Sequence, residues 1–152
     1  MSPHLTKRKM SQSVKVNPQN VVEVAREYLG APYLWQGRSG KGLDCIGLPI
    51  VVCQDLSLGE FDILDYGRTP SGQLKRRIGE VCTPLLSIRP GSLLIFKISV
   101  VEQHCAIASH YRDGWGMIHA SDAFLKVVEH RLTKDLEENL VAVYGLPGVK
   151  YD

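Results

Sequence analysis

The sequence contains no apolar run that approaches the length of a membrane span. Its first thirty residues also lack the hydrophobic core of a signal peptide, and no Leu-x-x-Cys lipobox lies near Met1. We therefore expect a protein that is synthesised in the cytoplasm without a signal peptide, has no membrane span and uses no export route that the sequence reveals.

Strong charge is also missing. The chain has 18 Lys and Arg residues against 16 Asp and Glu residues, and a formal net charge of +2 is too small to indicate a nucleic acid partner. Part of the basic excess lies in Lys7-Arg8-Lys9, where no apolar periodicity marks a helix or strand. We expect residues 1–16 to form a flexible N-terminal arm and residues 17–152 to form a single domain with one buried core.

The four cysteines form no Cys-x-x-Cys pair, which argues against a zinc ribbon and a thioredoxin-type motif. Cys53, Cys82 and Cys105 have apolar neighbours, so we interpret them as small core residues that stay reduced in the cytosol. Cys45 differs because it follows Asp44, a natural helix N-cap, and a helix N-terminus lowers the pKa of a thiol. From these two residues alone, an activated nucleophile and a buried structural cysteine are both open.

Helical patterns precede strand patterns along the chain. Three helices are expected at residues 17–29, 44–54 and 69–78, the first with Asn17-Pro18 as its start and Gly30 as its stop. The second is apolar on nearly all sides, and Pro49 should cost it one backbone hydrogen bond. Short apolar or β-branched runs then predict strands at residues 93–97, 104–110, 115–120, 125–129 and 140–144. This order predicts an α+β domain with the second helix packed on an antiparallel sheet.

Two histidines lie in strand patterns next to each other in the sequence. His104 opens one expected strand and His119 closes the next. An even-numbered hairpin loop would put His119 opposite Ala106 or Ala108, on the same sheet face as His104, and an odd loop would put it on the other face. On one face, the pair could act as a base and its orienting group. Two half-buried sheet histidines without function are the alternative.

The remaining histidines, His4, His110 and His130, have no comparable context, and we interpret them as surface residues. A zinc site formed by Cys45, His104 and His119 is a weaker alternative, because the sequence lacks the closely spaced ligand pair that zinc sites usually show.

Five segments, taken together, resemble the NlpC/p60 family of papain-like cysteine peptidases. They are YLGAPYLW (28–35), GLDCIGL (42–48), RPGSLLIF (89–96), HCAI (104–107) and MIHA (117–120). The resemblance covers roughly residues 20–146, and the order and spacing of the five make it more specific than any one motif. It implies an α+β fold in which N-terminal helices, including the nucleophile helix, pack on a five- to six-stranded antiparallel sheet.

The resemblance also implies roles for individual residues. Cys45 would be the nucleophile, His104 the general base and His119 the orienting third residue. Tyr33 would place its hydroxyl beside the cysteine as an oxyanion or substrate donor. Asp44 matches the acidic residue that meets the free amino terminus of the stem peptide.

Two positions depart from the pattern of the family, and a third adds to the expected substrate-binding residues. Ile46 stands where the family usually has a serine that helps to hold the substrate backbone. Gln36 replaces the first glycine of the usual Trp-Gly-Gly, which could change the shape of the loop above the cleft. Trp35 and Ile46 complete the expected substrate-binding residues.

The implied activity is a cysteine endopeptidase that hydrolyses γ-D-glutamyl–diamino-acid bonds in peptidoglycan stem peptides, with no cofactor or metal. The Asp-Cys-x-Gly-Leu form, residues 65–68 and the missing signal sequence resemble the phage-tail and gene-transfer-agent branch. Phage tail proteins are therefore expected partners, and the virion is the expected location. An amidase or acyltransferase on the same Cys-His fold and a catalytically silent tail or wall-binding module are the alternatives.

Overall fold

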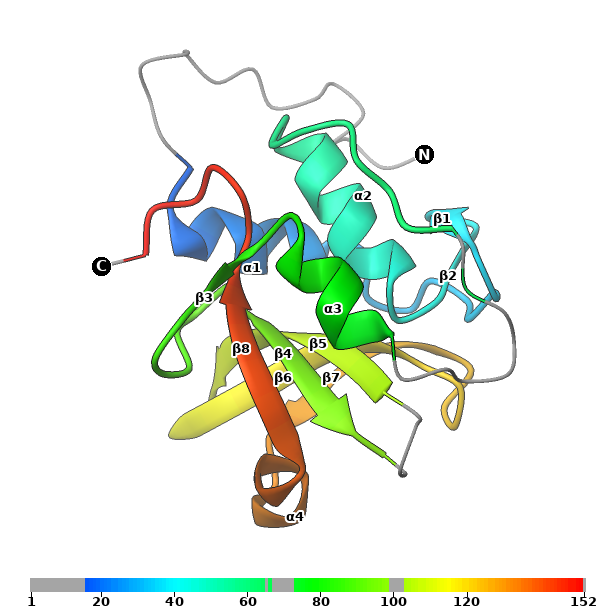
Figure 1. Cartoon of the computed structure of the whole chain (residues 1–152). Coiled ribbons are helices and arrows are strands. Elements are labelled where there is room, and N and C mark those ends of the chain that lie inside the picture. The colour runs from blue at the N-terminus through cyan, green and yellow to red at the C-terminus, as the bar shows by residue number, and fades with distance from the viewer. Residues whose placement is uncertain (1–15, 65, 67–72, 99–102, 152) are drawn as a thin grey trace.

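The structure is a computed structural model that describes residues 16–64, 66, 73–98 and 103–151 (Figure 1). Residues 1–15 of the expected arm, most of segment 65–68 and the expected helix start at Thr69-Pro70 lie outside the described residues. Val16 was expected in the arm, but it is only 5% exposed and forms a bridge with Val149, so it belongs to the domain. Among the described residues, no helix has both the length and the apolar character needed to span a membrane.

The described chain forms an α+β domain, as expected, with one large antiparallel sheet. The helices are α1 (Pro18–Arg26), α2 (Gly47–Asp55), α3 (Leu74–Gly79) and α4 (Lys134–Glu138). Between α1 and α2 in the sequence lies a small hairpin of β1 (Arg38–Ser39) and β2 (Gly42–Leu43). The large sheet has the strand order β3-β8-β4-β5-β6-β7. Its strands are β3 (Thr83–Pro84), β4 (Leu93–Lys97), β5 (Gln103–Tyr111), β6 (Gly114–Ser121), β7 (Lys126–Arg131) and β8 (Leu140–Gly145).

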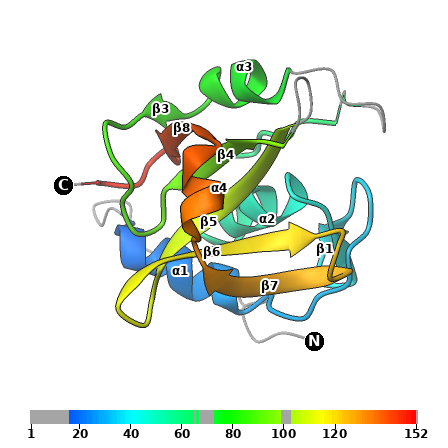
Figure 2. The same ribbon diagram turned by 90° about the horizontal axis from the view of Figure 1, so that it is seen from below.

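Helices cover both faces of the sheet. Figures 1 and 2 show α1 and α2 on one face, where the larger core cluster includes Ile95, Cys105 and Ile118. On the opposite face a smaller cluster includes Phe96 and Met117 and packs against Leu136 of α4. Successive residues of a strand therefore point into different cores, which fixes the face of every side chain in the central strands.

Helix α1 begins where the sequence predicts. The side chain of Asn17 accepts a hydrogen bond from the Asn20 amide at 2.9 Å, and the Asn17 amide donates back to Asn20 Oδ1 at 3.2 Å. Pro18 follows as the first helical residue, where a missing N–H costs nothing. This reciprocal cap fixes the direction in which the helix crosses the sheet.

Helix α2 begins at Gly47, three residues later than expected, although Asp44 still caps it. The Asp44 carboxylate accepts the Gly47 amide at 2.8 Å, and its carbonyl accepts the Leu48 amide at 3.2 Å. Cys45 therefore lies in the turn that leads into the helix rather than within it. Every residue of α2 from Gly47 to Cys53 is buried, which confirms its central place.

The register of β5, β6 and β7 decides between the two faces that the sequence left open for His119. The hairpin turn between β5 and β6 has two residues, and paired residues such as Ile107 and Ile118 have numbers with an odd sum. His119 therefore shares the face of His104, while Cys105 points to the opposite face with Ile95. In β7, His130 pairs with Met117 and so lies on the face of His119 as well.

A close backbone contact under α2 generates a stability prediction. A Cβ at Gly47 would lie 2.2 Å from the carbonyl oxygen of Gly37, whereas one at Gly40 would meet nothing within 4 Å. Gly47→Ala should lower the free energy of unfolding by about 1–3 kcal/mol, because backbone cannot move aside cheaply. Gly40→Ala is the matched control and should change it little. Urea unfolding of both variants measures the difference, and equal stability would contradict the contact.

Candidate active site

Cys45 and His104 come together at the start of β5. Cys45 is half-buried in the turn before α2, and His104 is the second residue of the strand. The pKa of the Cys45 thiol is lowered by the adjacent Cys105 side chain and by the His104 imidazole and its charge, against the opposing effects of burial and of Asp44. The cysteine and the first histidine of the expected set thus form an interacting pair.

Cys105 bonds to a backbone carbonyl that Pro49 leaves without its helical hydrogen bond. The amides of Leu48 and Ile50 bond to the carbonyls of Asp44 and Ile46, but Pro49 has no N–H to offer the carbonyl of Cys45. The Cys105 thiol donates to that carbonyl at 2.8 Å. The predicted loss of one helical hydrogen bond is therefore real, and a thiol from β5 replaces it beside Cys45.

A line of three histidines runs away from Cys45 across neighbouring strands. His104 Nε2 lies 2.8 Å from His119 Nδ1, and His119 Nε2 lies 2.8 Å from His130 Nε2. The far ring nitrogen of His130, Nδ1, lies 2.9 Å from the carbonyl oxygen of Arg131. His130 was expected at the surface, but it is half-buried and bonds to His119, so that expectation is wrong.

The same distances speak against a metal at the histidines. Two nitrogens that share one tetrahedral zinc ion, each about 2.0–2.1 Å from it, stand more than about 3 Å apart. His104 and His119 face each other at hydrogen-bond distance instead. Among the described residues, no group of three or more His, Cys, Asp or Glu side chains is arranged to hold a metal.

Asp44 is occupied by internal partners. Its Oδ1 accepts the Gly47 amide at 2.8 Å and Arg38 Nη1 at 3.2 Å, and its Oδ2 accepts the Gln36 amide at 2.7 Å and the Tyr66 hydroxyl. The residue is 2% exposed. All four acceptor positions of the carboxylate are used, one of them by the half-buried Arg38 guanidinium, so none is left for a substrate ammonium and the expected contact with a free amino terminus is corrected.

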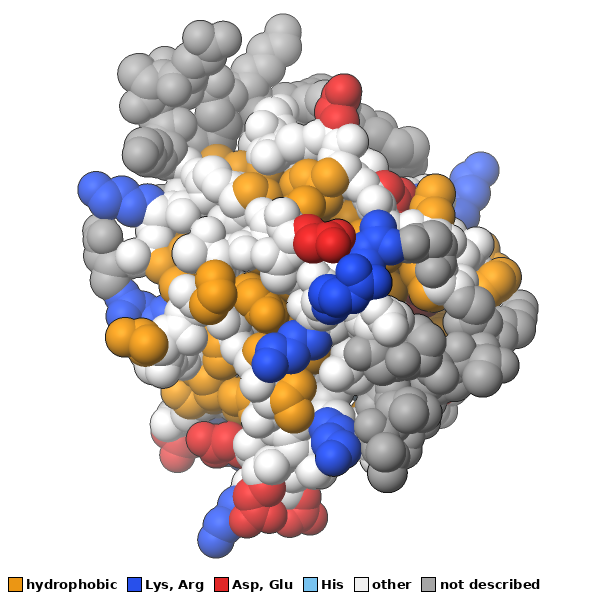
Figure 3. Space-filling model, viewed as in Figure 1, with side chains coloured by type: hydrophobic (Ala, Val, Ile, Leu, Met, Phe, Trp, Pro, Cys, Tyr) orange, Lys and Arg blue, Asp and Glu red, His pale blue; other side chains and the backbone are white. Residues whose placement is uncertain are grey.

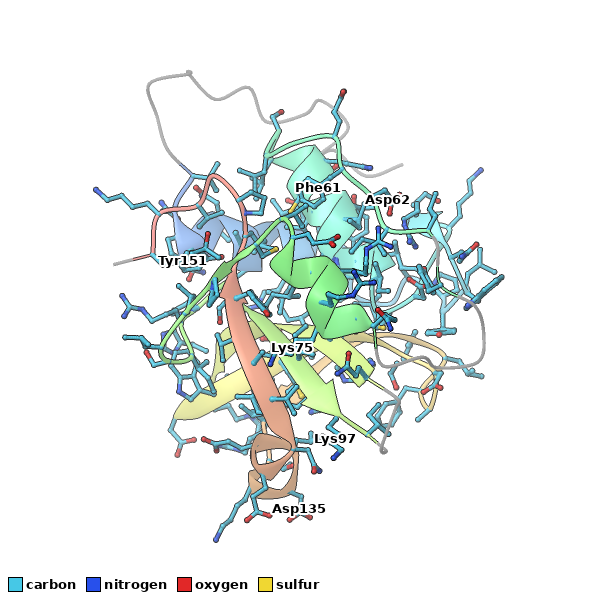
Figure 4. All side chains as sticks on the ribbon, viewed as in Figure 1. Phe61, Asp62, Lys75, Lys97, Asp135 and Tyr151 are labelled. Carbon is cyan, nitrogen blue, oxygen red and sulfur yellow. The ribbon has the colours of Figure 1, made fainter. Side chains whose placement is uncertain are left out.

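Arg38, which the sequence did not single out, ties this loop to the segment after α2. It bonds to Asp62 at 3.0 Å, to the Ile63 carbonyl at 2.8 Å and to the Tyr66 hydroxyl at 2.8 Å, besides Asp44. Figure 4 labels Asp62 on the stretch that follows α2. The guanidinium is thus a rigid fork that satisfies several acceptors at once.

Gln36 keeps the glycine-type backbone of the position it occupies. Its φ is 59°, in the left-handed region, and its side-chain amide bonds to the carbonyls of Leu64 and Tyr66. These two hydrogen bonds help to offset the cost of a side chain at positive φ. The expected change in the shape of the loop stays a prediction.

The other expected substrate-binding residues lie in three different surroundings. Ile46 is 8% exposed and lines an apolar cavity with Ile78 and Cys82, so it is a core residue and not a substitute for a substrate-binding serine. Tyr33 is half-buried and packs, like Cys45, against the core around α2. Trp35 is half-buried with its ring edge-on to that of Tyr66 at 6.3 Å. The oxyanion role of Tyr33 and the binding role of Trp35 stay predictions.

Comparison with known proteins supplies the family. The model of the NlpC/P60 family matches residues 30–142, which is well over half of the chain. The chain belongs to the NlpC/P60 family. An NlpC/P60 protein from Bacillus cereus shares 23% identity with it at a TM-score of 0.63, covering 86% of this chain and 40% of that one.

Two further solved structures are similar to this chain in fold. The NlpC/p60 domain of the peptidoglycan hydrolase SagA has 23% identity and a TM-score of 0.57, covering 86% of this chain and all of that domain. An N-acetylmuramoyl-L-alanine amidase from Bacteroides uniformis has 13% identity and a TM-score of 0.54, covering 84% and 96%. The chain thus spans a whole domain of one relative but less than half of the Bacillus protein. No curated protein sequence matches it.

The buried histidine of this site makes the domain sensitive to acid. Burial, and then the charges of His104 and His130, lower the pKa of His119 from 6.5 to about 3. Between these two values the unfolded chain binds a proton that the folded chain does not, so folded stability falls as the pH drops.

We expect His119→Asn to lose less stability than the wild type between pH 7 and pH 4, because asparagine does not titrate while all carboxylates stay the same. Urea midpoints at several pH values measure the loss for each protein. Parallel curves for the two proteins would show that His119 is not held neutral by the fold.

Proposed function

We propose that this NlpC/P60 domain is a cysteine peptidase that hydrolyses an amide bond in peptidoglycan stem peptides, the γ-D-glutamyl–diamino-acid bond. The observation that carries the proposal is the Cys45 thiol with its lowered pKa beside His104, with His119 bonded behind that base. A thiolate is the nucleophilic form of cysteine, and a base held by a second polar group is the arrangement that covalent catalysis requires.

In the proposed reaction, the Cys45 thiolate attacks the carbonyl carbon of the scissile amide, and the carbonyl oxygen takes up the negative charge. The intermediate collapses to a thioester as the leaving amine takes a proton from the His104 imidazolium. His104 then removes a proton from water, which attacks the thioester and releases the carboxylate product and the thiol. No cofactor is required for any of these steps.

Positive charge near the site suits a stem peptide, which carries free carboxylates. The amide of Lys75 bonds to the Gln103 side chain at 2.9 Å, and Lys97 pairs with Gln103 across β4 and β5. Gln103 immediately precedes His104. Figure 4 labels both lysines, and Figure 3 shows basic side chains over α3 on this face of the molecule. Their charge would favour acidic substrates at the entrance to β5.

Removal of either member of the pair tests the chemistry. Cys45→Ala and His104→Ala should each reduce hydrolysis of purified muropeptides by roughly 10³-fold or more, since the two residues act as one unit. Mass spectrometry of the fragments identifies the bond that is cut. Cys82→Ala serves as the control thiol variant and should hydrolyse at the wild-type rate. Turnover in Cys45→Ala would exclude covalent thiol catalysis, and release of intact stem peptides from the glycan would indicate an amidase.

Because Asp44 is fully bonded within the protein, we predict that it does not select substrates by their free amine. A stem tetrapeptide with a free amine and its N-acetylated form should be hydrolysed by Asp44→Asn in the same ratio as by the wild type, even if both rates fall with the loss of the Arg38 ion pair. Competition between the two peptides, followed by mass spectrometry, gives this ratio directly. A ratio that collapses only in Asp44→Asn would restore the carboxylate as an amine receptor.

Association with a phage tail and location in the virion are part of the proposal. They are supported by the Asp-Cys-x-Gly-Leu form and by residues 65–68, of which the structure describes Tyr66 alone. Tyr66 bonds to Asp44 and Arg38, so this residue reaches the loop that carries Cys45. Mass spectrometry of purified particles tests the location.

A further inference from the structure

His130 stands at the end of the histidine line without a part in the proposed reaction. The three histidines come from adjacent strands β5, β6 and β7 and share one sheet face. Their rings meet edge to face, with centroids 4.8 Å and 4.9 Å apart and interplanar angles of 82° and 85°. Each ring nitrogen therefore points along the line from one ring to the next, as in a chain of hydrogen bonds.

The last hydrogen bond of the histidine line fixes which nitrogen donates and which accepts in the other two. The carbonyl oxygen of Arg131 can only accept, so Nδ1 of His130 must donate to it. In a neutral His130, Nε2 then carries a lone pair and accepts from Nε2–H of His119. Burial holds the pKa of His119 at about 3, so this ring is neutral and its Nδ1 accepts from Nε2–H of His104. The hydrogen-bond network thus assigns every tautomer.

The assignment leaves Nδ1 of His104 for the Cys45 thiol, whose pKa His104 helps to lower. Nε2 of His104 keeps its proton whether the ring is neutral or has taken the proton of Cys45. The base can therefore change charge without any tautomer change in His119 or His130. A line that ended in water instead of a carbonyl would allow the opposite tautomers, in which Nδ1 of His104 carries a proton and has no lone pair for Cys45.

We propose that His130, held by the carbonyl of Arg131, is a positioning residue that sets the tautomers of His119 and His104. The role rests on the proposed function, because it matters only if His104 acts as the base. The anchor is rigid: Arg131 ends β7, pairs with Gly116, and is followed by Leu132, whose amide bonds to the Trp115 carbonyl at 2.9 Å. The acceptor that directs the line thus belongs to the sheet backbone and cannot rotate away.

Three variants separate this role from a structural one. His130→Leu removes the acceptor for His119, and His130→Gln keeps one in its side-chain oxygen. His110→Leu is the matched control, because His110 lies in β5 with His104, is exposed and stacks on Trp115 outside the line. Nitrogen-15 NMR of the imidazole rings reads the tautomers without any substrate, and steady-state kinetics on muropeptides reads the consequence.

In the wild type and in His110→Leu, His119 and neutral His104 should both show the Nε2–H form. In His130→Leu, these signals should shift toward mixed tautomers, and kcat should fall roughly tenfold with KM unchanged, since the lost hydrogen bond never touches substrate. His130→Gln should restore both the signals and kcat to within about threefold.

Wild-type signals in His130→Leu would overturn the proposal, as would equal losses of kcat and thermal stability in the leucine and glutamine variants. If the wild type cleaves no muropeptide, the proposed function fails. The NMR signals then still show whether His130 sets the tautomers.

Discussion

The antiparallel register of β5, β6 and β7 is the constraint on which the site depends. A shift of one residue in either pairing would send a histidine to the opposite face, into the core beneath α1 and α2. That core is tightly filled, with Ile107, Ile118 and Ala120 fully buried. The apolar alternation of the strands therefore fixes the register, and the register in turn aligns His104, His119 and His130. The core and the site are specified by the same pattern.

A second constraint places Cys45 against this line. The carboxylate of Asp44 joins the loop before α2 to Arg38 and Tyr66, and the close approach of Gly47 to Gly37 holds the start of α2 against the same loop. The charge of Asp44 by itself would raise the pKa of the neighbouring thiol. Arg38 forms an ion pair with that carboxylate, and Cys105 and His104 lower the pKa of Cys45. The loop thus combines rigid geometry with a balanced local charge.

The helix-then-strand order and the apolar helix after Cys45 were predictable, because each follows from periodicity. Strand alternation left two faces open for His119, and the two-residue hairpin turn decided between them. His130 was not predictable, because its face depends on the register between β6 and β7, which a short polar-flanked strand does not reveal. Asp44 and Ile46 were misjudged for a related reason. A motif shows where a residue stands in the sequence but not what its side chain contacts. The Asp44 carboxylate bonds to Arg38 and Tyr66, and the Ile46 side chain lines the cavity around Ile78.

The central claim is that Cys105 and His104 lower the pKa of the Cys45 thiol, and the pH dependence of alkylation tests it most directly. Iodoacetamide labelling of each cysteine, followed by mass spectrometry, gives an apparent pKa for each thiol. Burial raises the pKa of Cys82 to about 11 and also raises that of Cys53, so these thiols act as internal references. Cys45 should label well below the ordinary thiol range of about 8.5, and His104→Ala should move it upward. A Cys45 that titrates like a free thiol in both proteins would contradict the account.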